Sequence, residues 1–277
     1  MTSLFYVATR WWRGRNLVHK YFTPNVIVPN LRRIRLTLEY DGTPFYGWQS
    51  QKSPEVPTIQ KELEKAFFAL TGAPPEDMAA AGRTDKGVHA TGMICHIDTF
   101  HTTEIKKIKT GLNRYLPDGI AVLMAEETDQ YFHARYCCKE RHYQYKILNR
   151  MARSPLWHNR AALVRHPLDV AAMAEGAKVL EGSHDFSAFR SSECQGKTPV
   201  TTLNKLTISE ENGLITFDIH GVTFLHNMVR ILVGTLVDVG HGKIDAQAVA
   251  TILAHKDRKK AGKTMPPHGL YFTKALF

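Results

Sequence analysis

The chain has 277 residues, of which 43% are hydrophobic and 10% aromatic, so it can fill one large core or two smaller ones. Its longest apolar runs, such as ILVGTLVDVG, fall short of the roughly 20 residues that a helix needs to cross a bilayer, so no membrane span is expected. The formal net charge is +10, but residues 1–38 hold seven basic and no acidic residues, which leaves only +3 for the remainder. Net charge alone is therefore weak evidence for a polyanionic partner.

Residues 1–30 contain two tryptophans and several arginines but no acidic residue, a composition typical of an organellar transit peptide. A disordered extension, or a start codon placed too far upstream, is favoured because serine is scarce and no amphipathic face develops. In either case, residues 1–30 are expected to lie outside the fold. We expect a cytoplasmic protein, or a mitochondrial one if residues 1–30 are a transit peptide.

The segment 31–136 is predicted to form one α+β domain. In RRIRLTLEYDG, apolar and polar residues alternate over residues 33–40, which predicts a strand that ends at an Asp-Gly turn. Thr58 can cap a helix whose apolar face ends at Gly72. The order β-α-β-β-α-β is completed by short strands near 79–82 and 91–98, a helix over 103–116 and a strand over 120–127.

Residues 137–277 are predicted to repeat that order in a second α+β domain. The segment 224–240 is apolar on nearly all sides, which indicates a buried helix. The other expected elements are a strand over 141–149, a helix over 169–182, a hairpin around Asn212–Gly213, a helix over 245–257 and a strand over 269–277. Two ferredoxin-like halves, each with helices on one face of a sheet, would leave a cleft near their boundary at 135–139.

Cysteine and histidine spacing gives little support for a disulfide framework or a metal site. The four cysteines form no CxxC pair, and the fourteen histidines include no HExxH or HxH run. Without a secretory signal, the cysteines are expected to be reduced thiols of an intracellular protein. Basic residues cluster within 106–114 and 256–263, where a nucleic-acid contact and a solvated helix face are equally reasonable interpretations.

The segment AAGRTDKGVHA, residues 80–90, places Asp85 between Arg83 and Lys86 in a glycine-bounded loop. The two cations would favour the ionised carboxylate, and the glycines let backbone approach a ligand closely. This suits a nucleophile or a base. A glycosidase would need a second carboxylate, and a phosphate-binding loop would need GxxxxGK[ST]; neither can be assigned. From the residues alone, an Arg83–Asp85 salt bridge that serves only the turn is an equally good interpretation.

GRTDKGVHA resembles the signature of the tRNA pseudouridine synthase A (TruA-type) family, in which the aspartate is the essential catalytic residue. Further blocks resemble this family in the same order: LEYDGTPFYGWQSQ, LNRYLPDGIAV, FHARYCCKERHYQYKI, DFSAFRSSECQGKTP, FLHNMVRILVGTLVDVG and GLYF. The resemblance covers about residues 32–277. It implies isomerisation of uridine to pseudouridine on the 3′ side of the tRNA anticodon stem-loop, at positions 38–40, without a cofactor or metal ion, by a homodimer.

The resemblance also implies roles for single residues. Asp85 would act at the ribose or the base, by attack on C1′, by addition to the ring or by removal of a 2′ proton. Arg83 would brace the vacancy that the flipped uridine leaves, and Tyr143 would stack on the target base. Arg230 would pair with Asp85, and Leu270 would form an apolar wall of the base pocket. Contacts with tRNA are implied for Phe132, His133, Arg135, Cys194, Gln195 and Lys197.

Other interpretations of these residues stay open. Tyr143 and Leu270 could be ordinary core residues, and Tyr145 shares a strand face with Tyr143; family position favours Tyr143 for the site and Tyr145 for packing. His89 is expected to be structural. One competing function is a non-catalytic RNA-binding protein on the same fold. Another is a small-molecule glycosyl hydrolase, which is weaker because no acid/base pair of carboxylates is visible.

Overall fold

The computed structural model describes residues 27–277 apart from 52, 54 and 192–197, so most of the predicted N-terminal extension lies outside the described residues. The first half contains β1 (Arg32–Tyr40), α1 (Ile59–Thr71), β2 (Asp77–Ala80), β3 (His89–Thr99), α2 (Ile105–Tyr115) and β4 (Ile120–Thr128). The second half contains β5 (Glu140–Asn149), β6 (Ala162–Val164), α3 (Val170–Lys178), β7 (Gly182–Asp185), β8 (Val200–Glu211), β9 (Leu214–Gly221), α4 (Met228–Gly240), α5 (Ala248–His255) and β10 (Leu270–Leu276).

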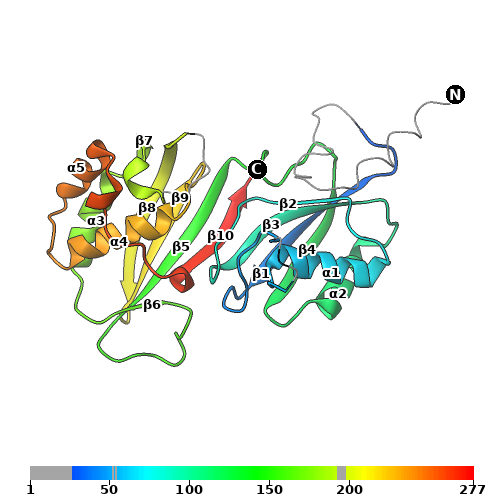
Figure 1. Ribbon diagram of the computed structural model, residues 1–277, viewed down its shortest axis with the longest axis horizontal. Coiled ribbons are helices and arrows are strands. Elements are labelled where there is room, and N and C mark those ends of the chain that lie inside the picture. The colour runs from blue at the N-terminus through cyan, green and yellow to red at the C-terminus, as the bar shows by residue number, and fades with distance from the viewer. Residues whose placement is uncertain (1–26, 52, 54, 192–197) are drawn as a thin grey trace.

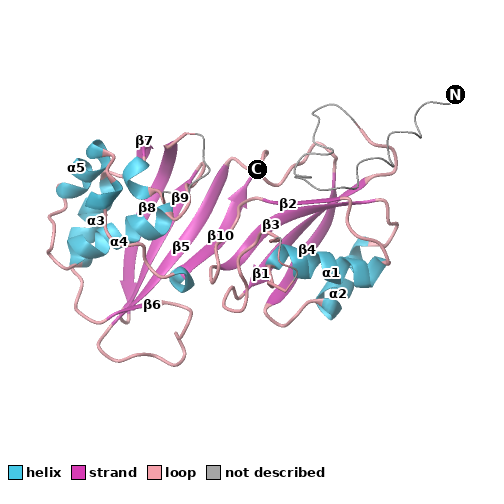
Figure 2. Ribbon diagram, viewed as in Figure 1, coloured by secondary structure: helices cyan, strands magenta, loops and turns pink. Residues whose placement is uncertain are grey.

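One continuous sheet joins the two halves (Figure 2). Its strand order is β4-β1-β3-β10-β5-β9-β8-β7, with β2 paired to β3 and β6 paired to β5. Within it, β4-β1-β3-β2 and β10-β5-β9-β8 each have the ferredoxin-like order, so the predicted pair of β-α-β-β-α-β halves is confirmed. Strands β6 and β7 were not expected, because three or four residues are too few to show a period of two.

The C-terminal strand β10 connects the halves. It pairs in parallel with β3 through Tyr271 and Phe272, and antiparallel with β5 over Leu270–Leu276. In Figure 1 the red strand β10 lies beside β5, with α1 and α2 on the first-half strands and α3, α4 and α5 on the second-half strands. Strand β10, the last strand of the chain, therefore completes the second half and attaches it to the first.

Local signals in the sequence explain where the elements begin and end. As predicted, Thr58 caps α1, where its side chain accepts a hydrogen bond from the Lys61 N–H, and the helix ends at Gly72. Gly72 adopts the left-handed conformation. The expected hairpin turn forms at Asn212–Gly213, where both residues have positive φ. Helix α4 begins at Met228, later than expected, because Asn227 adopts a left-handed conformation with φ of 63°.

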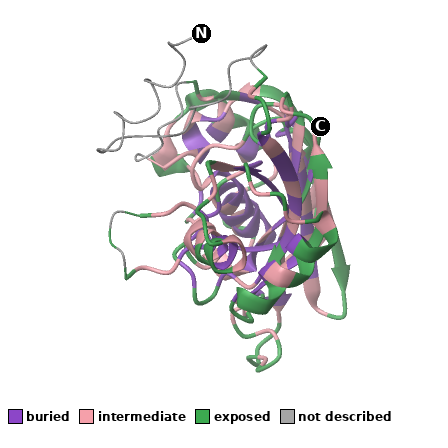
Figure 3. Ribbon diagram, turned by 90° about the vertical axis from the view of Figure 1, so that its right-hand side faces the viewer, coloured by how far each residue is buried: buried purple, intermediate pink, exposed green. Residues whose placement is uncertain are grey.

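Burial follows the expected pattern. Figure 3 shows buried residues along the strands and on helices packed against them, with exposed residues toward the outside. Helix α4 is buried on nearly all sides, as predicted, and a Cβ at Gly234 would lie 1.9 Å from the Lys263 carbonyl oxygen, so glycine permits this close approach. Among the described helices, none is both long and apolar enough to cross a membrane.

A buried ion pair ties β1 to β3 and to the segment that leads toward the second half. Arg33 is 1% exposed and Asp98 is fully buried. Nε and Nη2 of Arg33 each donate to one oxygen of Asp98 at 2.6 Å. Its Nη1 donates to the carbonyl oxygens of Gln130 and Phe132. The paired guanidinium thus satisfies both a buried carboxylate and two loop carbonyls.

We expect Asp98→Asn to lower the free energy of unfolding by about 3–5 kcal/mol, because it leaves the Arg33 charge buried without its counter-charge. Urea denaturation measures the change. The control is Glu175→Gln, which breaks the exposed Lys178–Glu175 pair and should cost less than about 1 kcal/mol. Equal, small effects of the two substitutions would contradict the role given to the buried pair.

Candidate active site

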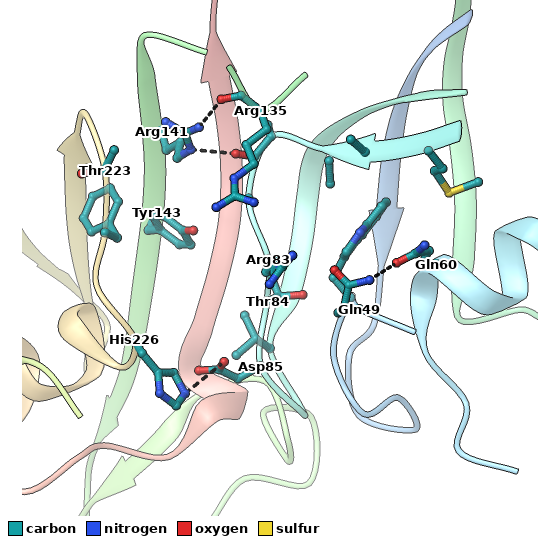
Figure 4. Close-up of a pocket in the computed structure, with 18 of the residues that line it drawn as sticks. Gln49, Gln60, Arg83, Thr84, Asp85, Arg135, Arg141, Tyr143, Thr223 and His226 are labelled. Atoms are coloured by element: carbon teal, nitrogen blue, oxygen red, sulfur yellow. Dashed lines mark hydrogen bonds and ion pairs between the residues drawn. The ribbon is translucent and has the colours of Figure 1, made fainter. Parts of the chain in front are cut away.

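A cavity of about 950 Å³ is lined by residues from both halves (Figure 4). Its walls include Arg83 and Asp85 from the loop before β3, Tyr143 from β5 and Leu270 from β10. Arg230 lines a neighbouring cavity that also contains Asp85. The five residues that the resemblance assigns to catalysis and base binding are therefore brought to one region, although the loop, β5, α4 and β10 are far apart in the sequence.

The segment before α1 holds the Asp85 loop in place. The Trp48 N–H donates to the Thr84 carbonyl oxygen at 3.0 Å, and the hydroxyls of Tyr40 and Thr84 are hydrogen-bonded at 2.9 Å. Gly47 has φ of +86°, and a Cβ there would lie 2.3 Å from the Thr84 carbonyl oxygen. Glycine is required at this position both by the backbone conformation and by the close approach of the loop.

Two side chains from the second half contact the Asp85 carboxylate, which is 38% exposed. Its Oδ1 lies 3.5 Å from His226 Nε2, and its Oδ2 lies 3.6 Å from Arg230 Nη1. Figure 4 shows the His226 ring pointing toward the carboxylate. Among the described residues, Asp85 forms no ion pair with Arg83, and the Lys86 ammonium lies 3.7 Å from the centroid of the Tyr46 ring. The side chains that contact Asp85 thus come from α4 and the loop before it, not from neighbours in sequence.

Arg230 is held in position by two further acceptors. Its Nε donates to the Met265 carbonyl oxygen, and its Nη1 donates to Asn227 Oδ1, both at 2.6 Å. Burial lowers the pKa of Arg230, whereas the charge of Asp85 acts in the opposite direction. A cation in an apolar helix needs such partners, and Arg230 finds them at the first turn of α4, beside the cavity.

The two neighbouring tyrosines of β5 have different environments. Tyr143 lines the cavity, and its ring meets Phe224 and Phe272 edge-on with centroids 4.8 and 5.2 Å away. Burial raises the pKa of Tyr143; Arg141 opposes this shift and the Asp85 charge adds to it. Tyr145 is fully buried, and its hydroxyl donates to the Pro266 carbonyl oxygen at 2.7 Å. The structure thus gives Tyr145 a packing position and leaves Tyr143 at the cavity wall.

Arg141 and His226 were missed in the sequence. The buried Arg141 guanidinium donates to carbonyl oxygens of both halves and their connection, at Ala81, Arg135, Cys138 and Val222, over distances of 2.6 to 3.4 Å. A usable signal was present, because Arg141 shares the alternating apolar face of Tyr143 and Tyr145. For His226 the signal was its spacing of four residues before Arg230. That spacing becomes informative only once α4 is known to face Asp85.

The residues expected to contact tRNA are distributed differently. Arg135 is exposed and lines the cavity. His133 also lines it but is buried, and its Nδ1 accepts hydrogen bonds from the N–H groups of Arg135 and Tyr136. The Phe132 ring packs on Phe277, away from the cavity walls. Cys194, Gln195 and Lys197 lie outside the described residues.

His89 has a structural environment, as expected. It is buried, its Nδ1 accepts a hydrogen bond from the Gly42 N–H at 3.1 Å, and its Nε2 lies 2.8 Å from the Asn159 carbonyl oxygen. Its ring stacks on Tyr271 of β10. Burial lowers the pKa of His89. The imidazole therefore holds the start of β3 against neighbouring segments.

Comparisons with known proteins show the family to which the chain is similar. A family model described as tRNA pseudouridine synthase matches residues 37–137 and 177–277. The tRNA pseudouridine synthase A of Neisseria meningitidis serogroup C is 43% identical over 242 residues, covering 87% of this chain and 91% of the relative. Those of Ehrlichia canis and Acetivibrio thermocellus are 44% and 42% identical, covering 87% and 89% of this chain and 98% and 100% of the relatives.

The close approach at Gly47 leads to a test of how the Asp85 loop is held. Gly47→Ala should lower the free energy of unfolding by about 3 kcal/mol or more, because left-handed backbone strain of about 1–2 kcal/mol is added to a clash with Thr84. Gly72→Ala is the matched control, since Gly72 is also left-handed but has open space around it. Hydrogen exchange at residues 84–88 should accelerate only in Gly47→Ala. Equal effects of both substitutions would contradict the clash.

Proposed function

Because the chain belongs to the tRNA pseudouridine synthase family, we propose that it isomerises uridine to pseudouridine in the tRNA anticodon stem-loop, at positions 38–40, with Asp85 as the catalytic residue. In this reaction the bond from N1 to C1′ breaks, the uracil turns, C5 bonds to C1′, and C5 loses a proton while N1 gains one. The observation that supports Asp85 is its carboxylate, placed in the cavity between the halves and contacted by Arg230 and His226.

The contacts on Asp85 suit a reacting group. Distances of 3.5 and 3.6 Å exceed the roughly 2.7–2.9 Å of close charge-assisted hydrogen bonds, so the carboxylate is positioned and still available to a substrate. An ionised carboxylate can attack C1′, add to the ring or accept a proton. A partly exposed carboxylate between Arg230 and the His226 ring also differs from a buried salt bridge that only stabilises a turn.

The rest of the cavity suits an unstacked base. Extruding a uridine from a stem costs a few kcal/mol, which contacts with the flipped base must offset. Tyr143 offers a ring for stacking, and Leu270 offers an apolar wall. Partial burial, followed by the nearby Arg135 charge, lowers the pKa of Arg83. We assign Arg83 and Arg135, which line the cavity, to RNA contacts. Arg83 fills the space that the flipped uridine leaves in the base stack.

Further assignments rest on the same family membership. We assign Phe132, His133, Arg135, Cys194, Gln195 and Lys197 to tRNA contacts. Residues 31–136 and 137–277 form the two domains in this proposal, and the enzyme is a cytoplasmic homodimer, or a mitochondrial one if residues 1–30 are a transit peptide. Light scattering of the purified protein tests the dimer, and mapping pseudouridine in a tRNA transcript incubated with the protein tests the substrate position.

Asp85→Asn should reduce pseudouridine formation by about 1,000-fold or more, equivalent to about 4 kcal/mol in the barrier, because the amide can neither attack nor accept a proton. Binding of tRNA should change little, since phosphate contacts dominate affinity. Turnover and filter binding are measured on the same preparation. Retained turnover would remove Asp85 from the chemistry. Wild-type protein that binds tRNA but never forms pseudouridine would favour a non-catalytic RNA-binding protein.

Arg230→Met should lower turnover by about 10- to 100-fold, because an interaction with an ionised partner is worth about 1.5–3 kcal/mol. Methionine fills the space of the buried stem, so the fold should persist. Lys86→Met is the control: it removes a cation one residue from Asp85 in sequence but one that lies on the Tyr46 ring. If Lys86→Met impairs turnover as much as Arg230→Met, the contact from α4 is not the important one.

A further inference from the structure

Three potential metal ligands lie together on the sheet face opposite the cavity. Glu140 and His142 are two residues apart on β5, and His220 of β9 is directly opposite His142 in the strand register. Arg141 and Tyr143, which alternate with them on β5, face the cavity instead. The three side chains are therefore neighbours because of strand pairing, although His142 and His220 are far apart in the sequence.

The geometry of this cluster suits one small cation. One ligand atom from each of Glu140, His142 and His220 lies within 4.8 Å of the others. The two imidazole rings are stacked, with centroids 3.7 Å apart and planes inclined by 5°. The Glu140 carboxylate is hydrogen-bonded to His142 Nε2.

A fourth residue orients the carboxylate. Asn204 Nδ2 donates to the second oxygen of Glu140. The β8–β9 register shifts between Leu203 and Lys205, so Asn204 stands at an irregularity that re-aims its side chain. Metal-binding carboxylates and imidazoles are commonly fixed by such outer hydrogen bonds. The side chains of His142 and Glu140 are 15% and 22% exposed, which leaves one side open to solvent.

A second cluster, Asp77, His96 and Asp98, is a poorer candidate. Arg33 engages both carboxylate oxygens of Asp98 at 2.6 Å, so that carboxylate is already neutralised by a buried cation. Near Glu140 the competing cations are the exposed Lys205 and Lys274, whose repulsion is reduced by solvent. The Glu140 carboxylate on β5 is therefore more available to a metal ion than the Asp98 carboxylate, which Arg33 already neutralises.

We propose that Glu140, His142 and His220 form a zinc site, with Asn204 orienting Glu140 and water completing the tetrahedron. Two imidazoles and one carboxylate are ligands that Zn²⁺ accepts, at about 2.0–2.2 Å. Rotation of the side chains brings the ligand atoms around one centre. The ion clamps β5 to β9 on the face away from the cavity, so it stabilises the second half without entering the reaction.

The experiment titrates the full chain with Zn²⁺ alone, by calorimetry with a competing chelator, and with Co²⁺ alone, by visible absorption. The wild-type protein should bind one more Zn²⁺ ion tightly than the double variant with His142→Asn and His220→Asn. Only the wild-type protein should give the intense Co²⁺ absorption band of a tetrahedral site. Glu140→Gln should weaken binding by more than about 10-fold, and Asn204→Ala by about 10-fold, typical of an outer-shell loss. His255→Gln, on the exposed end of α5, should bind as wild type does.

The double variant should still form pseudouridine and keep its circular dichroism, because both histidines face away from the cavity. Glu140→Gln serves as a milder variant if the double variant unfolds. Equal Zn²⁺ affinity and stoichiometry in wild type and Glu140→Gln would overturn the site. This result would leave the proposed isomerase activity untouched, since neither titration uses tRNA.

Discussion

The pairing of β10 with both β3 and β5 is the constraint on which the candidate active site depends. Neighbouring strands lie about 4.8 Å apart, so the single intervening strand sets β3 and β5 roughly 10 Å from each other. Asp85 precedes β3, and Tyr143 belongs to β5. Phe272 of β10 lies between these two strands and contacts the Tyr143 ring. The width of the cavity is thus set by backbone hydrogen bonds rather than by flexible side chains.

Hydrophobic packing of α4 positions the side chains that contact Asp85 in this cavity. Helix α4 is fixed by apolar contacts along nearly its whole length, and its first turn places Arg230 beside Asp85. His226, in the loop just before α4, contacts the other carboxylate oxygen. The N-terminal end of a helix also carries partial positive charge, which acts in the same sense as the Arg230 charge. A carboxylate on the first half is therefore positioned by the rigid core of the second half.

The sequence allowed the two ferredoxin-like halves to be predicted, because each strand and helix has its own periodicity and caps. It also singled out Asp85, Tyr143, Arg230 and Leu270 through the family resemblance. The residues next to Asp85 in the sequence did not predict its contacts. Lys86 lies on the Tyr46 ring, and Arg83 forms no ion pair with Asp85. Contacts of this kind depend on how α4 packs across the cavity. Arg141 was also missed because its acceptors come from three separate segments, at Ala81, at Arg135 and Cys138, and at Val222.

The alternation of β5 separates two kinds of chemistry on one strand. Arg141 and Tyr143 face the cavity, whereas Glu140 and His142 face the other side of the sheet. Side chains on opposite faces share only backbone, so a change at His142 acts on the cavity through strand pairing and not through direct contact. Spacing rules for metal motifs could not identify that cluster, because its second histidine arrives from β9. The same pairing of distant segments that builds the candidate catalytic cavity on one face thus brings together Glu140, His142 and His220 on the other.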